Sequence, residues 1–157
     1  MINYDSIYDS RLDTLKHREM VIDFTLLIVN EIIETVILHD ESKLHEPELS
    51  IFNEYTPRLK GSTYGSEEYK SFLKEMKVAL DHHYKNNNHH IEYFENGIQG
   101  MNLINLTEMF CDWMAATKRH NDGDIMKSIE INQERFGYSD DIKEILKNTA
   151  LLLNEKS

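Results

Sequence analysis

The apolar residues of this 157-residue chain recur at helical spacing almost from one end to the other. Leucine, isoleucine and aromatic side chains follow one another three or four positions apart, which places them on one face of an α-helix. Strict alternation of apolar and polar residues, the pattern of a half-buried strand, does not extend over any sizeable stretch. A chain of this length can bury a sizeable core. We therefore expect an all-α domain of about six helices spanning residues 1–157.

Capping residues, glycines and prolines place the boundaries of these helices. A first apolar run ends at Leu38, and a loop from Ser42 leads into a short helix with Pro47 in its first turn. Ser66 is suited to cap the helix that follows a glycine-containing loop, and Gly137 is suited to end a later one. Further helices are predicted over residues 67–84, 103–119, 125–136 and 140–153, with loops over 57–66 and 85–90.

Charge and cysteine content narrow the classes of function. A net charge of −11 argues against a general DNA- or RNA-binding surface, which requires basic residues, but permits a small anionic substrate beside a local cation. The single cysteine, Cys111, is expected to be a small buried residue, excludes an internal disulfide and favours a reducing, cytoplasmic setting. The apolar stretch over residues 24–38 contains Asn30, Glu31 and Glu34, so it is too polar to span a bilayer, and no membrane partner is expected.

Metal-ligating chemistry is concentrated at the adjacent pair His39–Asp40. The pair closes an apolar helical run, where an imidazole and a carboxylate can turn onto one divalent cation, and Lys43 is close enough to reach the same site. The chain holds eight histidines, of which four form the doublets His82–His83 and His89–His90. Imidazole with carboxylate suits Mn, Fe, Co, Ni or Zn better than Ca. The sequence predicts one or two such divalent ions, with Mg as a further candidate.

The order of these residues resembles the HD-domain superfamily of metal-dependent phosphohydrolases. The string LHDESK resembles that family's Leu-(Leu)-His-Asp-x-x-Lys motif, and CDWMAATKR resembles its last motif, in which an Asp, here Asp112, is followed by small residues and an Arg. The resemblance covers residues 12–120. It is closest to small uncharacterised bacterial and phage members that carry a His-Asp-x-Ser-Lys string and a second His-His doublet.

The resemblance implies a single HD-type domain acting as a divalent-metal-dependent phosphohydrolase. The implied substrate is a small phosphate ester, a nucleotide or nucleotide second messenger, hydrolysed by attack of a metal-bound hydroxide. Asp40 and Lys43 are the implied catalytic residues. The implied metal ligands are His17, His39, Asp40, His83, His89 and Asp112. The implied substrate contacts are Lys43, His82, His90, Lys118 and Arg119, although the sequence does not decide which member of each doublet is a ligand.

The position of His17 sets a geometric condition. If residues 17–39 form one straight helix, His17 and His39 lie roughly 33 Å apart at 1.5 Å per residue and cannot share a metal ion within the chain. They can share one only if the chain reverses near Val29–Glu31 into a helical hairpin. Asn30 tolerates a turn, but neither Gly nor Pro marks a break there. The sequence leaves both arrangements open.

Simpler interpretations exist for several of these residues. His17 lies between two basic residues and can be an ordinary surface side chain. Glu108, one turn before Asp112, can either orient a histidine ligand or be polar surface. His45 and His120 are expected in exposed loops rather than in the site.

Functions of other classes also have to be weighed. The chain lacks the His-Glu-x-x-His motif of zincin proteases, the repeated Glu-x-x-His of di-iron bundles and any glycine-rich phosphate loop. A non-catalytic HD-like module that binds or sequesters a nucleotide or a protein partner remains the main alternative. An HD-type di-iron oxygenase is a weaker one. The large apolar helical faces are compatible with a homodimer.

Overall fold

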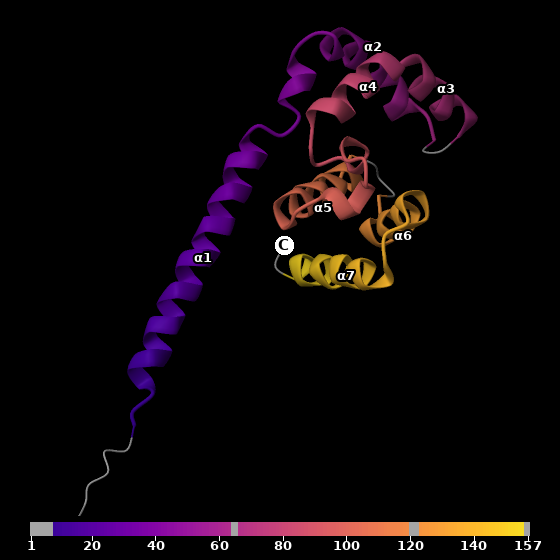
Figure 1. Ribbon diagram of the computed structural model, residues 1–157. Helices are drawn as coiled ribbons and strands as arrows, with labels where there is room; N and C mark the ends of the chain where they lie inside the picture. Colours follow the sequence, from indigo (N-terminus) through magenta and orange to yellow (C-terminus); the bar gives the residue numbers. More distant parts are fainter. Residues whose placement is uncertain (1–7, 64–65, 120–122, 156–157) are drawn as a thin grey trace, which may run out of the picture.

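The computed structural model describes residues 8–63, 66–119 and 123–155. These ranges contain seven α-helices, three short 3-10 helices and no strand, so the predicted all-α fold is confirmed. Helices α2 to α4 gather at the C-terminal end of α1, and α5 to α7 form a second group of helices below them (Figure 1). None of the described helices combines the length and apolarity needed to cross a bilayer.

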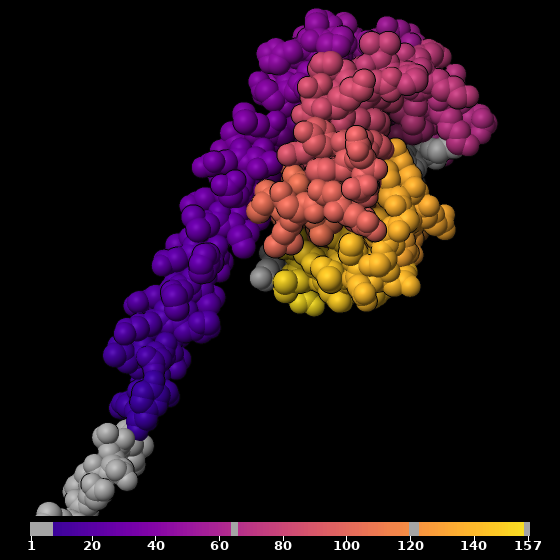
Figure 2. All heavy atoms as spheres, in the orientation of Figure 1, coloured from indigo at the N-terminus to yellow at the C-terminus, as the bar shows by residue number. Residues whose placement is uncertain are grey.

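The first helix, α1 (Arg11–Ile37), is uninterrupted over 27 residues, about 40 Å in length. The straight alternative is therefore the one adopted, and the chain does not reverse at residues 29–31. No glycine or proline interrupts the helix, and the threonine hydroxyls of Thr25 and Thr35 donate to carbonyls one turn earlier instead of breaking it. Only the C-terminal part of α1 packs on the body, through α5, while the rest projects as a separate rod (Figure 2).

Two predicted boundaries were wrong in the next segment. Pro57 lies inside α2 (Glu48–Gly61), not in a loop, and Pro47 precedes the helix as its N-cap. A proline is tolerated there because Asn53, whose carbonyl loses its helical partner, faces solvent. The helix predicted over 67–84 is divided into α3 (Glu67–Glu75) and α4 (Lys77–Asn86) at the fully buried Met76.

The main apolar core is formed by α5 (Leu103–Thr117), α6 (Ile125–Phe136) and α7 (Asp140–Asn154). Gly137 ends α6 in the left-handed region at φ 67°, as predicted, and the Ser139 side chain caps α7. The buried residues of this core are Phe110, Ile129, Tyr138, Leu146 and Ala150.

Helix α5 separates this core from the histidine-rich side of the molecule. Its residues Phe110 and Met109 are buried, but Cys111 is exposed, contrary to the prediction, because it lies on the solvent-facing side of the same helix. The segment between α4 and α5 contains two 3-10 turns, Ile91–Tyr93 and Gly97–Gly100. This segment returns the chain from the end of α4 to the start of α5, so that the second histidine doublet faces the C-terminal end of α1.

Candidate metal centre

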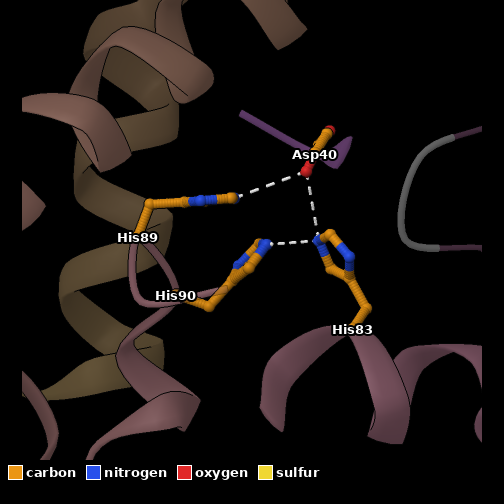
Figure 3. A group of neighbouring side chains, drawn as sticks. All are labelled: Asp40, His83, His89 and His90. Carbon is orange, nitrogen blue, oxygen red and sulfur yellow. Dashed lines mark hydrogen bonds and ion pairs between the residues drawn. The ribbon is translucent and has the colours of Figure 1, made fainter. Parts of the chain in front are cut away.

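Four segments of the chain converge on one cluster of histidine and acidic side chains. His39 and Asp40 come directly after α1, and His83 lies on α4. His89 and His90 follow in the loop after α4 (Figure 3). The fourth segment is α5, whose Glu108 and Asp112 are four residues apart and therefore share one face of the helix.

Asp40 occupies the centre of this cluster because of an unusual backbone conformation. It is the single described non-glycine residue with a positive φ, 59°, and so lies in the left-handed region that aspartate tolerates better than most residues. This conformation ends the helical path and starts a 3-10 turn over Glu41–Leu44. The turn brings Lys43 back toward Asp40, with Nζ 2.6 Å from Oδ2.

The two carboxylate oxygens of Asp40 face different histidines. Oδ1 lies 3.3 Å from His83 Nε2 and 3.5 Å from His89 Nε2 (Figure 3). His90 adds a third imidazole, with its Nε2 atom 2.8 Å from His83 Nε2. Ligand atoms of Asp40, His83, His89 and His90 all lie within 4.8 Å of one another, which is close enough for a single ion to contact all four.

A second group of ligand atoms adjoins the other Asp40 oxygen. His39 Nε2 lies 3.5 Å from Asp40 Oδ2 and 3.6 Å from Asp112 Oδ1. Asp40 therefore lies between two sets of donors, one with three further histidines and one with His39 and Asp112. A carboxylate in this position can bridge two cations.

Two buried glutamates determine which nitrogen of His39, His83 and His89 faces the cluster. Glu108 Oε1 accepts hydrogen bonds from Nδ1 of His39 and Nδ1 of His89, at 2.9 and 3.1 Å. Glu48 Oε2 lies 2.9 Å from His83 Nδ1. A carboxylate at neutral pH only accepts, so each Nδ1 carries a proton, and each Nε2 is the atom that can offer a lone pair to a cation once it is deprotonated. This arrangement of carboxylate, histidine and ligand position is typical of metal sites.

An alternative grouping uses the same atoms differently. His39, His89 and Glu108 are also close enough together to hold an ion of their own. We favour the orienting role for Glu108, because both imidazoles approach it through Nδ1 at hydrogen-bond distance and keep Nε2 turned toward Asp40.

Unsatisfied buried atoms support a cation at the cluster. Within the described residues, Asp40 Oδ1 and His89 Nε2 are buried and have no hydrogen-bond partner, although they lie 3.5 Å from each other. Buried polar atoms are almost always paired, so two neighbouring exceptions require an explanation. A divalent cation contacting both atoms would satisfy them, and the residues present therefore fit a metal ion.

The acidic groups and imidazoles shift one another's pKa values strongly. The polar contact with Asp112 and the hydrogen bond to Glu108 raise the pKa of His39 to about 10, against the effect of burial. Burial raises the pKa of Glu108, but contacts with His39 and His89 outweigh burial and lower it to about 2. Burial also opposes ionisation of Asp40, yet the neighbouring imidazoles and Lys43 hold the pKa of that carboxyl well below its usual range. The cluster thus attracts positive charge at neutral pH, and a bound cation would displace protons.

The pKa of His90 is shifted in the opposite direction to those of His39 and His89. Burial, followed by repulsion from His89 and His83, lowers the pKa of His90 to about 3. Its imidazole is therefore neutral at physiological pH and keeps a lone pair. His90 was predicted as a substrate contact, but the structure places it among the candidate metal ligands.

Several predicted site residues are not brought to the cluster. His17 is exposed on α1, 22 residues before His39 on nearly the same helix and so roughly 33 Å away. Lys118 and Arg119 are exposed at the C-terminal end of α5, about 9 Å or more along the helix from Asp112. His82 is turned toward Glu48, at 2.7 Å, and not toward Asp40.

The structure also places His45, Glu108 and Glu48, one as expected and one that the sequence did not indicate. His45 is exposed and pairs with Glu41, as its predicted loop position requires, whereas His120 lies outside the described residues. Glu108 is 3% exposed and is not polar surface. The sequence gives no signal that Glu48 belongs to the site. It is the first residue of α2 and is fully buried, whereas a glutamate at the start of a helix is usually exposed.

A cavity of about 380 Å³ opens beside the cluster. Glu31, Glu34 and Thr35 of α1 form one wall, and His89 and Glu108 connect the cavity with the candidate ligands. Tyr93 and the run Asn86–Asn88 complete most of the remaining lining. The size is in the range of small-molecule sites, which span roughly 300–1,000 Å³.

Comparison with known proteins identifies a family but no function. No curated protein and no solved structure matches the chain. A family model, that of the family of unknown function DUF5662, matches residues 6–154. Because this match spans nearly the whole chain, the protein belongs to the family DUF5662.

Proposed function

We propose that this protein is a divalent-metal-dependent phosphohydrolase of HD type that acts on a small phosphate ester. The observation that carries the proposal is the convergence of three imidazole Nε2 atoms on the two oxygens of Asp40, two of the atoms involved being buried and unpaired. The order of the chain's histidines and acids, which resembles that superfamily, supports the same conclusion.

The residues divide into two candidate ligand sets that share Asp40. His83, His89 and His90 form the first set, and His39 with Asp112 forms the second. When bound, a divalent cation would polarise a phosphoryl oxygen and make a coordinated water more acidic, to a pKa of about 7. The structure's own contribution is to orient the imidazoles of His39, His83 and His89 through Glu48 and Glu108, and to bury His83 and His89 away from bulk water.

Lys43 is the group best placed to contact a substrate phosphate. Its ammonium pairs with Asp40 Oδ2 and lies 5.1 Å from the centre of the Phe52 ring, at the partly exposed edge of the cluster. A phosphate entering from that edge would meet this positive charge next to the candidate ligands. Because the chain's net charge is −11, such a local cation is needed to bind an anionic substrate.

The substrate class rests on the resemblance and on the neighbouring cavity. A volume of about 380 Å³ holds a small molecule but not a polymer, in agreement with a nucleotide or nucleotide second messenger. The acidic wall formed by Glu31 and Glu34 would repel phosphate, so we place the phosphate at Lys43 and a neutral or cationic part of the substrate in the cavity.

The test combines metal content with phosphate release. Untagged wild type, Asp40→Asn and the control Asp81→Asn, an exposed acid on α4, would be analysed for bound transition metals after purification without chelator. We expect one or two equivalents in wild type and control, and loss in Asp40→Asn. Hydrolysis of p-nitrophenyl phosphate, its bis ester and a nucleotide panel would then be measured with Mn, Fe, Co, Ni, Zn or Mg added.

The outcomes separate the two classes of function. Metal-dependent release of product by wild type and control, but not by Asp40→Asn, supports the hydrolase. Bound metal with stoichiometric nucleotide retention and no product supports the non-catalytic binding module. A wild type that takes up none of these metals contradicts both.

A further inference from the structure

One side of α1 carries an apolar seam that runs along nearly its whole length. The seam follows steps of three and four residues, the heptad spacing of a coiled coil. All of its apolar members are exposed, with 38–61% of their surface open to solvent. The seam consists of Leu12, Leu15, Glu19, Ile22, Leu26, Val29, Ile33 and Val36.

The seam points away from the rest of the molecule. In α1 the half-buried residues are Ile32 and Thr35, which mark the side of the helix that packs on the body. At 100° per residue, the seam is centred ~130° around the helix from that side. The residues of α1 that line the cavity beside the histidine cluster, Glu31, Glu34 and Thr35, also face away from the seam. The seam is therefore free to pair without displacing any contact described above.

The size of the seam fits a specific interface. Its apolar side chains expose on the order of 600 Å², and adjoining side chains such as Ile37 and the stems of Lys16 and Arg18 extend the strip toward the roughly 800 Å² per partner of a standard interface. A solitary surface helix would have no reason to keep a heptad seam over about 40 Å. We propose that this seam pairs with the same seam of a second copy of the chain, as an antiparallel two-stranded coiled coil.

The charges along α1 favour one relative direction of the two helices. In the N-terminal half Arg11, Lys16 and Arg18 are balanced by three acidic residues, whereas the C-terminal half carries Glu31 and Glu34 and no basic residue. A parallel pair would place the two acidic halves side by side. The antiparallel pair places each acidic half beside the partner's N-terminal half, which has no net charge and contains three basic residues, and this lowers the electrostatic energy.

Glu19, the one charged member of the seam, also favours the antiparallel direction. In a parallel pair Glu19 would face its own copy within the seam, which is unfavourable for like charges. In an antiparallel pair centred near residue 24, Glu19 lies opposite Val29, Leu15 lies opposite Ile33, and Ile22 lies opposite Leu26. The two bodies then lie at opposite ends of the paired helices.

The molecular mass of the full chain in solution tests the pairing. Wild type should behave as a dimer of about 37 kDa, twice the 18.5 kDa of one chain, in light scattering coupled to size exclusion. Ile22→Glu/Leu26→Glu should be a monomer. The control is Phe24→Glu in the same turns of α1: Phe24 is the more exposed residue, at 67%, but lies off the seam, so this variant should remain a dimer. Circular dichroism would establish that all three are equally helical.

Disulfide trapping tests the direction independently of these variants. In a Cys111→Ser background, Leu15→Cys mixed with Ile33→Cys should give a cross-linked dimer on oxidation, whereas Leu15→Cys alone should not. A cross-link formed by Leu15→Cys alone would establish a parallel pair and contradict the proposal. A wild type that is monomeric up to ~100 μM, well above the Kd of most specific complexes, would overturn it entirely, whether or not the helix then binds lipid vesicles.

Discussion

Glu108 accepts hydrogen bonds from two histidines at once, so the replacement Glu108→Gln tests how the candidate centre is built. The amide has nearly the same shape, and its oxygen can still accept from Nδ1 of His39 and of His89. It lacks the negative charge that strengthens both hydrogen bonds and holds each Nε2 lone pair toward Asp40. Its NH2 group would also take the place of the buried Oε2 atom, which has no described donor, and would itself be unsatisfied.

The expected magnitude follows from these contacts. Loss of a carboxylate that orients a histidine ligand typically weakens metal binding about 10- to 100-fold, or ~1.4–2.7 kcal/mol. Because Glu108 orients one histidine of each candidate ligand set, both sets should be affected, and the upper end of that range is expected. The number of ions bound at saturation should not change, because the candidate ligands themselves remain.

The assay is calorimetric titration of chelator-treated protein with Mn²⁺ or Zn²⁺ at pH 7.5. Glu95→Gln, at an exposed position in the same half of the chain, is the matched control and should titrate like wild type. An unchanged affinity in folded Glu108→Gln would refute the orienting role. Loss of one whole equivalent of metal would show instead that Glu108 is a direct ligand, in the alternative grouping with His39 and His89.

Three further predictions address the substrate contact, the pH dependence and the core. Lys43→Met should retain metal but lose about 100-fold in kcat on a phosphate ester, since it removes a cation near the reacting group, as steady-state kinetics would reveal. Because the pKa of His39 is raised to about 10, its charged form stabilises the metal-free fold fully below pH 6.5, and this contribution is lost as the pH rises through 10. Thermal melts of the chelator-treated protein should therefore show a melting temperature that declines over this pH range. A melting temperature that does not change with pH would contradict the ion pairs of His39. Ile129→Ala should lower the free energy of unfolding by about 2–4 kcal/mol in urea titrations, whereas Ile131→Ala, half exposed on the same helix, should cost under about 1 kcal/mol.

Helix boundaries were predictable where a local signal determines them. Ser66 and Ser139 cap helices through their own side chains, and Gly137 supplies a left-handed residue, so each acts within a few positions of its place in the sequence. The division at Met76 has no such signal, because burial of that side chain between packed helices causes it. Pro57 favours a loop in the sequence, because a helix tolerates proline only where the carbonyl that loses its partner, here that of Asn53, can face solvent.

The same contrast between local signals and long-range packing applies to the candidate site. His39–Asp40 is recognisable because two ligand types are adjacent in the chain, and the histidine doublets are conspicuous for the same reason. Glu48 lies 34 residues before His82, and their contact exists only because α2 packs on α4. His17 could not be assigned from sequence, since its distance from His39 depends on whether α1 is interrupted.

The left-handed backbone of Asp40 makes one residue responsible both for the direction of the chain and for the central oxygen ligands. A non-aspartate side chain here must accept a conformation that costs most residues about 1–2 kcal/mol, and asparagine and glycine are the usual exceptions. A library randomised at position 40 and selected only for soluble expression should therefore already return Asp, Asn and Gly in excess. Enrichment of aspartate at this position is thus no evidence of catalysis by itself, because the turn favours it before any ion is bound.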